Sequence, residues 1–310
     1  MLTDFFLFLL GLALLAYGAK RSIHYAVELS RILNLDKYGV GAGIIATITS
    51  LPELAVAVFA VLEGVPSVAV GTAFGSVVGL FLLSLGFLSL IAPLSFPKER
   101  KKELIRALTI VVYVVIVITL MKTIPPVLGV LLIILYFLYV KGLHEGTLAT
   151  LNTRRKRQSA ISSTAKLTLS IIVLLIGAEI VTKTITAIAD AFGISPFVIA
   201  FVAIALGTNL PEISVEAAAA LSGNVSIAVG DILGSAVADL TLVLGAAAIV
   251  GALTGNPVVF SGRIHLVAGI LLGVAVVLLK AVKDENITIW EGVGLILAYV
   301  LVVSTEILSA

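Results

Sequence analysis

The pentapeptide TSLPE at residues 49–53 lies inside a long apolar stretch and brings a proline and a glutamate into it. A second pentapeptide of the same form, TNLPE, occupies residues 208–212 in another apolar stretch. Proline removes a helical hydrogen bond, and a carboxylate is costly in apolar surroundings. Two interruptions of the same form indicate an internal repeat rather than an isolated loop.

The composition is that of a chain that crosses a membrane many times. Of its 310 residues, 60% are hydrophobic and 12% are charged, and the mean hydropathy is +1.21. Apolar stretches of about 20 residues, the length that crosses a bilayer, recur from end to end. Cysteine is absent, which excludes disulfides and thiolate metal sites. We therefore expect an all-α polytopic membrane protein in a lipid bilayer, with no enzymatic activity and no nucleic-acid partner.

Turn and charge signals divide the sequence into ten predicted transmembrane spans. Their approximate limits are 3–19, 39–62, 67–92, 104–121, 124–142, 166–189, 196–221, 225–252, 263–281 and 288–308. The longest hydrophilic stretch separates the fifth span from the sixth. We therefore expect a five-span repeat over residues 1–142, a short basic cytoplasmic linker over 143–165 and a second five-span repeat over 166–310.

The distribution of lysine and arginine predicts an orientation. Of these 20 residues, 17 follow odd-numbered spans and 3 fall on the other side. The positive-inside rule then places the odd loops in the cytoplasm and both termini outside it. We expect the protein in the plasma (cell) membrane.

A shift of 159 residues superposes the two halves. Residues 49–86 then match residues 208–245 at 18 of 38 positions without a gap. Because each half has an odd number of spans, the second copy enters the membrane from the opposite side. The sequence thus predicts two inverted five-helix repeats with interrupted helices at the centre. In secondary transporters this architecture places the substrate site near the midplane.

The interruptions supply oxygen atoms. Pro52 has no N–H for the carbonyl of Ile48, and Pro211 has none for that of Gly207. In hydrocarbon a free carbonyl persists only where protein, water or an ion satisfies it, so carbonyls near these breaks are candidate ligands. Side-chain oxygens lie beside them at Thr49, Ser50, Thr208 and Asn209.

Glu53 and Glu212 add charge at matching depths. An acid at a helix centre costs about 2.5–3.5 kcal/mol on insertion scales and marks an ion path or a proton relay. Carboxylates with carbonyls and hydroxyls form a hard-oxygen site that suits Ca2+, because Mg2+ retains its waters. Na+ could use the same oxygens one at a time.

The next span of each half presents a second stripe. Residues four apart share one helix face. The stripes are Thr72, Ser76 and Leu80 in the first half, and Asp231, Ser235 and Asp239 in the second.

Together these residues resemble the cation/Ca2+ antiporter superfamily, specifically its Na+/Ca2+ exchanger branch. The resemblance implies a monomeric antiporter with alternating access, in which the first and sixth spans slide across the core. Ca2+ and Na+ would bind as transported substrates, with no other cofactor. Asn209 before Leu-Pro-Glu is also similar to H+-coupled Ca2+ exchangers, so H+ in place of Na+ is the alternative.

The resemblance also implies roles for individual residues. Glu53 and Glu212 match the Ca2+-binding glutamates, and Thr49 and Thr208 match carbonyl ligands. The other ligands that it implies are Ser50, Asn209, Ser76, Ser235, the carbonyls of Ala46 and Ala205, and Asp239. The chain departs from the family at Leu80, which stands where a polar residue is usual, and at Thr72, which replaces a common asparagine.

The sequence leaves alternative roles for two acids, and it allows two other functions to be considered. Glu216 could line the access path or form a polar patch near it, and Asp231 could belong to the ion pathway. The VGD motif at 229–231 is similar to an intramembrane aspartyl protease, but Asp231 and Asp239 share one span, whereas such an enzyme needs two spans. A passive cation channel usually builds its filter from oligomeric symmetry, so an internal repeat disfavours it.

Overall fold

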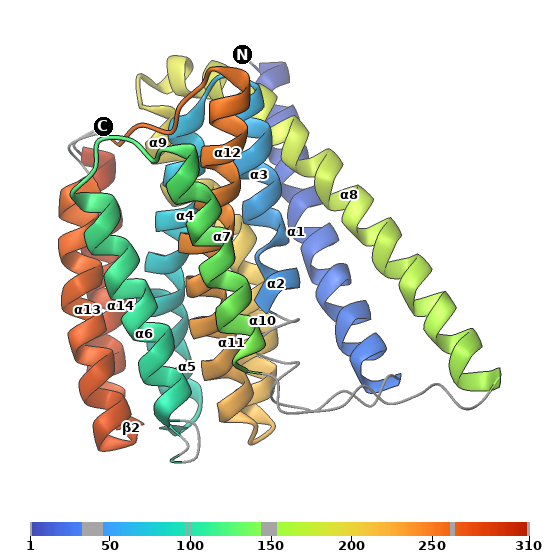
Figure 1. Cartoon of the computed structure of the whole chain (residues 1–310), viewed down its shortest axis with the longest axis vertical. Helices are drawn as coiled ribbons and strands as arrows, with labels where there is room; N and C mark the ends of the chain where they lie inside the picture. Colours follow the sequence, from blue (N-terminus) through green and yellow to red (C-terminus); the bar gives the residue numbers. More distant parts are fainter. Residues whose placement is uncertain are drawn as a thin grey trace.

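The computed structural model describes residues 2–32, 46–96, 98, 101–143, 154–260 and 264–308, and this part of the chain is almost entirely helical (Figure 1). The first half contains α1 (Leu2–Ile32), α2 (Ala46–Thr49), α3 (Leu51–Leu62), α4 (Pro66–Val78), the π-helix η2 (Gly79–Ser84), α5 (Leu85–Ile91), β1 (Leu94–Ser95), α6 (Lys101–Thr119) and α7 (Pro126–Lys141). The second contains α8 (Arg154–Phe192), α9 (Pro196–Ile199), η4 (Ala200–Ile204), α10 (Ala205–Leu221), α11 (Val225–Ala238), η5 (Asp239–Val243), α12 (Leu244–Thr254), α13 (Ile264–Asp284), β2 (Asn286–Ile287) and α14 (Ile289–Leu308).

Seven helical stretches of the described residues are long and apolar enough to cross a membrane. They are Leu2–Leu29, Pro66–Ile91, Ser159–Phe192, Pro196–Leu221, Val225–Thr254, Ile264–Asp284 and Ile289–Leu308. Of the three other predicted spans, 39–62 begins outside the described residues, and 104–121 and 124–142 correspond to α6 and the shorter apolar helix α7. The total of ten therefore stays a prediction.

Two helices run beyond the limits predicted for their membrane spans. The first span was expected to end at residue 19, but α1 continues to Ile32, so Lys20 and Arg21 are helical rather than part of a loop. The sixth was expected to begin at residue 166, but α8 begins at Arg154, inside the predicted linker. Lysine, arginine and glutamate are good helix formers, so charge ends a membrane span without ending its helix.

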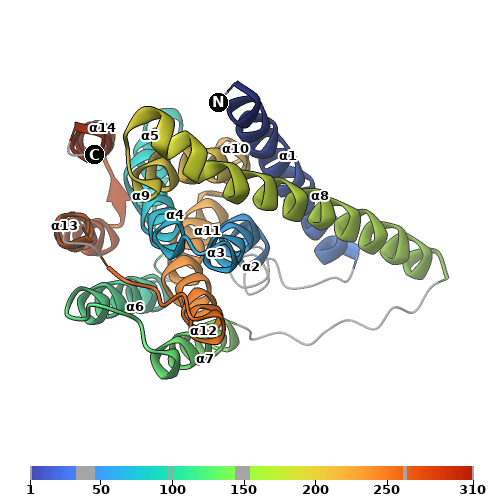
Figure 2. The same ribbon diagram turned by 90° about the horizontal axis from the view of Figure 1, so that it is seen from above.

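α1 and α8 form a pair of long helices at one side of the molecule. They lie side by side, slanted against the remaining bundle (Figure 1), and α6, α13 and α14 lie on the opposite side (Figure 2). Their 31 and 39 residues span about 45 and 60 Å at 1.5 Å per residue, more than the ~30 Å hydrocarbon core.

Glycines let α1 and α8 approach closely, and the contacts are reciprocal. A Cβ added at Gly18 would lie 2.6 Å from the backbone nitrogen of Leu174, and one at Gly177 would lie 2.5 Å from that of Leu15. The 159-residue shift superposes Gly18 on Gly177 and Leu15 on Leu174. Each helix therefore presents the same pair of residues to the other.

Other contacts between the halves repeat in the same way. A Cβ at Gly86 of α5 would meet the carbonyl of Gly292 on α14, and one at Gly245 of α12 would meet that of Gly129 on α7. Gly86 and Gly245 are again 159 residues apart. The connecting segments pair as well, through the antiparallel strands β1 and β2 and through a bridge between Thr123 and Val259.

Alanine at Gly177 is expected to destabilise the protein. Its Cβ would press on the α1 backbone, which cannot move aside as a flexible side chain can, so we expect a loss of about 1–3 kcal/mol. Gly273→Ala on α13, where a Cβ meets nothing within 4 Å, is the matched control. Thermal unfolding in detergent should show a melting temperature lower by about 2–8 °C for Gly177→Ala alone. Equal melting temperatures would contradict the close packing.

Candidate cation site

The pentapeptides TSLPE (49–53) and TNLPE (208–212) lie in helices of different construction. In the first half the helix breaks at Ser50, between α2 and α3, as the sequence predicts. In the second half α10 continues through Pro211, so the expected interruption is absent there. Proline removes a single helical hydrogen bond, and the neighbouring bonds are sufficient to keep the helix continuous.

The threonines bind the backbone in the same way in both halves. The Thr49 hydroxyl donates to the Ala46 carbonyl at 3.0 Å, and that of Thr208 donates to the Ala205 carbonyl at 3.1 Å. The Ala46 carbonyl also accepts from the backbone nitrogen of Ser50 at 3.1 Å. A carbonyl has two acceptor positions, so Ala46 would have to exchange one of these bonds to bind a cation.

Side chains from opposite halves meet in the centre. Thr49 Oγ1 and Ser235 Oγ are 2.9 Å apart. The Ser76 hydroxyl donates to Asn209 Oδ1 at 2.9 Å, and Asn209 Nδ2 donates to the Ser76 carbonyl at 3.0 Å. The structure therefore brings four predicted site residues together as two pairs. One pair joins α2 to α11, and the other joins α10 to α4.

Three buried carboxyl groups lie at this junction. Glu53, Glu212 and Asp239 are each at most 1% exposed, and neither oxygen of any of them has a hydrogen-bond partner. The carboxyl of Glu53 interacts electrostatically with those of Glu212 and Asp239, so the three would repel one another if all were charged. Buried charge without a partner is strongly unfavourable, and a bound cation or a proton would remove that cost.

The neutral oxygens around the carboxyls complete the donor set. The Ser50 hydroxyl is 1% exposed and has no hydrogen-bond partner. It lies near Asp239, as does Ser76, and the side chain of Thr208 lies near Glu53. No group of three or more His, Cys, Asp or Glu side chains in the described ranges is placed to chelate a metal. The unpartnered groups gathered here are therefore carboxyl and hydroxyl oxygens.

The sequence did not predict the π-helices. η2 begins at Gly79 and η5 at Asp239, and the 159-residue shift places η2 on residues 238–243. π-Turns inside α-helices are frequent at functional sites. Here they set the position of Leu80 and its counterpart Asp239. A Cβ at Gly79 would collide with Asn209 Nδ2, and one at Gly75 with the carbonyl of Phe201. These glycines, which the sequence marks as positions of close helix approach, let the two halves meet here.

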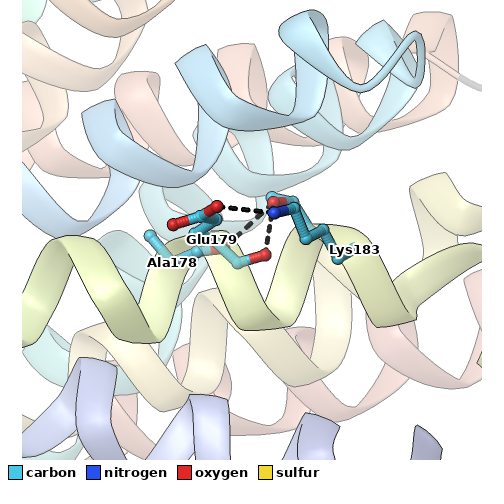
Figure 3. A network of polar contacts seen from close by, with 4 residues as sticks. Ala178, Glu179 and Lys183 are labelled. Atoms are coloured by element: carbon cyan, nitrogen blue, oxygen red, sulfur yellow. Dashed lines mark hydrogen bonds and ion pairs between the residues drawn. The ribbon is translucent and has the colours of Figure 1, made fainter.

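A charged pair on α8 lies outside this site. Lys183 Nζ is 2.6 Å from Glu179 Oε1, one turn away, and the two side chains point toward each other (Figure 3). The Thr182 hydroxyl donates to the carbonyls of Ala178 and Glu179, both at 3.1 Å. The charged side chains are about half exposed, so they form a surface pair.

Comparison with known proteins decides the family. The profile of the sodium/calcium exchanger protein family matches residues 3–142 and 162–308. The chain belongs to this family.

Individual relatives agree with the assignment. Sodium/calcium exchanger MaX1 of Methanosarcina acetivorans is 25% identical, and the putative antiporter CaxA of Alkalimonas amylolytica is 26% identical. The alignment covers 96% of this chain and of MaX1, and 94% of this chain and 95% of CaxA. The solved sodium-calcium exchanger NCX_Mj, soaked with Na+, superposes with a TM-score of 0.72 at 26% identity over 97% of this chain and 98% of that one. This chain therefore shares the fold of that exchanger over nearly the whole of both chains.

Leucine at Asn209 is expected to weaken the junction between the halves. It removes both bonds to Ser76 and leaves the buried Ser76 hydroxyl without its acceptor, whereas the Ser76 carbonyl still accepts from the backbone nitrogen of Gly79. The unsatisfied hydroxyl costs about 1–3 kcal/mol. Ser214→Ala on the same helix is the control, since its exposed hydroxyl bonds only to the carbonyl of Leu210. We expect a lower melting temperature for Asn209→Leu alone, and equal values would show that the amide does not hold the halves together.

Glutamine at Lys183 should change stability very little. An exposed ion pair at this helical spacing contributes about 0.3–0.5 kcal/mol. Thermal unfolding should therefore shift by no more than about 2 °C. A larger drop would mean that this pair has a structural role that its exposure does not suggest.

Proposed function

We propose that this member of the sodium/calcium exchanger family is a secondary antiporter that exchanges Ca2+ for Na+ by alternating access. The observation that carries the proposal is the set of buried carboxyls at the junction of the halves, Glu53, Glu212 and Asp239, without hydrogen-bond partners. Such a cluster needs a cation or protons to be stable. A structural role would instead be expected to pair each carboxyl with a donor.

In the proposed site Ca2+ binds the carboxylates of Glu53 and Glu212 and oxygens of Thr49 and Thr208. Na+ competes for the same region, with Asp239 on one side only because Leu80 is its counterpart. The remaining ligands of the proposed Na+ positions are Ser50, Asn209, Ser76, Ser235, and the carbonyls of Ala46 and Ala205. Hydrogen bonds join Thr49 to Ser235 and Ser76 to Asn209. We propose that a bound ion replaces some of these bonds.

The reciprocal contacts support the proposed inverted repeat. Gly18 meets Leu174 as Gly177 meets Leu15, at positions related by one constant shift. Two such halves can exchange conformations, so that each opens the same site to one side of the membrane. In this scheme α1 and α8, which pack mainly on each other, move together across the core. α1 begins and α14 ends at the same end of the molecule, as an even number of crossings requires (Figure 1). We place both termini outside the cytoplasm of a plasma-membrane protein that functions as a monomer.

H+ is the second candidate for the coupling ion. The specific feature in its favour is the site itself, since carboxyls can exchange Ca2+ for protons as well as for Na+. The name CaxA, an antiporter among the relatives, does not specify the counter-ion.

Transport by reconstituted protein tests the proposal. Liposomes loaded with Na+ and diluted into Na+-free medium should accumulate 45Ca2+, and Glu53→Gln or Glu212→Gln should reduce the initial rate at least 100-fold, because each removes a charged ligand. Glu63→Gln, at the exposed C-terminal end of α3, is the matched control and should transport normally.

The gradient that drives uptake identifies the coupling ion. Accumulation that follows a pH gradient and ignores Na+ would replace Na+ by H+ in the proposal. Uptake that needs neither gradient would contradict antiport.

A further inference from the structure

Two further acids lie buried next to the proposed site and have no role in it. Glu216 lies on α10, one turn after Glu212, and Asp231 lies on α11; they are 1% and 3% exposed. Ser84, the last residue of η2, is fully buried and comes from the other half. α10, α11 and η2 all pack against one another, so the three side chains lie where three elements meet.

The carboxyl groups are only partly satisfied. The Ser84 hydroxyl donates to Glu216 Oε2, which fixes the orientation of that carboxyl, while Glu216 Oε1 has no partner. Asp231 Oδ1 is buried without a partner too, and the two carboxyls interact with each other. Neither Glu216 nor Asp231 forms an ion pair with another described side chain, and the pairs Lys98–Glu285, Lys183–Glu179 and Lys280–Glu291 join other groups. Two like charges thus share a buried region with no cation from the described side chains.

The repeat does not require these acids. At the matching positions the first half has Ala57 for Glu216 and Thr72 for Asp231, and the second half has Val243 for Ser84. The corresponding helices of the first half, α3 and α4, therefore pack without the two carboxyls. Since burying them is costly, a ligand that offsets the cost is the physical reason to have them.

We propose that Glu216, Asp231 and Ser84 form a second Ca2+ site, about 6 Å along α10 from Glu212. Two carboxylates match the charge of a divalent cation, the Ser84 oxygen adds a third donor, and water completes the roughly 6–8 ligands that Ca2+ takes. The site takes the ion of the proposed function and serves as a station between solution and the centre. Because it occurs in one half only, it lies on the route to one side of the membrane.

Calcium titration calorimetry on purified protein tests this site separately from transport. Glu53→Gln disables the central site, and that variant should still bind Ca2+. Adding Glu216→Gln or Asp231→Asn should weaken the remaining binding at least tenfold. Adding Glu63→Gln, an exposed acid, should leave it unchanged. Thermal unfolding of each variant establishes that it is folded, and the two alternative second substitutions guard against the failure of either one.

The outcomes separate the two proposals. Equal Ca2+ affinity in Glu53→Gln with and without the second substitution, or no Ca2+ binding by Glu53→Gln, would overturn the second site. Wild-type protein that transports no Ca2+ in liposomes would overturn the proposed function instead. The binding comparison would stand in that case.

Discussion

Burial of carboxyl groups without partners is the constraint on which the rest of the structure depends. Glu53, Glu212 and Asp239 are removed from water by the packing of four central helical segments, and none of their oxygens finds a donor. The cost of that arrangement is several kcal/mol for each charged group in a protein interior. It is tolerable in a molecule whose substrates are cations. The fold keeps the carboxyls buried and supplies neutral oxygens beside them, which is the donor set that the proposed hard-oxygen site requires.

Polar pairs join the two halves at this centre, and two long helices lie beside it. Between the halves, Thr49–Ser235 and Ser76–Asn209 hold the core together through hydroxyl and amide groups that can also bind an ion. Outside it, α1 and α8 touch along glycines and slant across the core. The proposed alternating access would use these polar pairs, which a bound ion can replace, and the two long helices, which pack mainly on each other.

Much of this follows from the sequence, and the exceptions have physical reasons. The 159-residue shift identified Glu53 and Glu212, which the structure buries at one junction, because paired acids in apolar segments are rare. The predicted span limits did not give the helix ends: α1 runs past residue 19 and α8 begins before residue 166, because nothing in local composition stops a helix of Lys, Arg and Glu residues. The continuous helix through Pro211 and the π-turns at Gly79 and Asp239 depend on tertiary packing, which sequence periodicity does not report. The ion-binding role of every predicted ligand, the carbonyls of Ala46 and Ala205 included, stays a prediction.

The most direct test of the central claim is the position of a heavy calcium analogue in a crystal of this protein. Crystals soaked in Sr2+ at low Na+ should give an anomalous difference peak between the carboxyl groups of Glu53 and Glu212, and raising Na+ should remove it. A peak that persists at high Na+ would contradict competition for one site. No peak between the two glutamates, with Sr2+ bound elsewhere, would contradict the account of these carboxyls as the cation site.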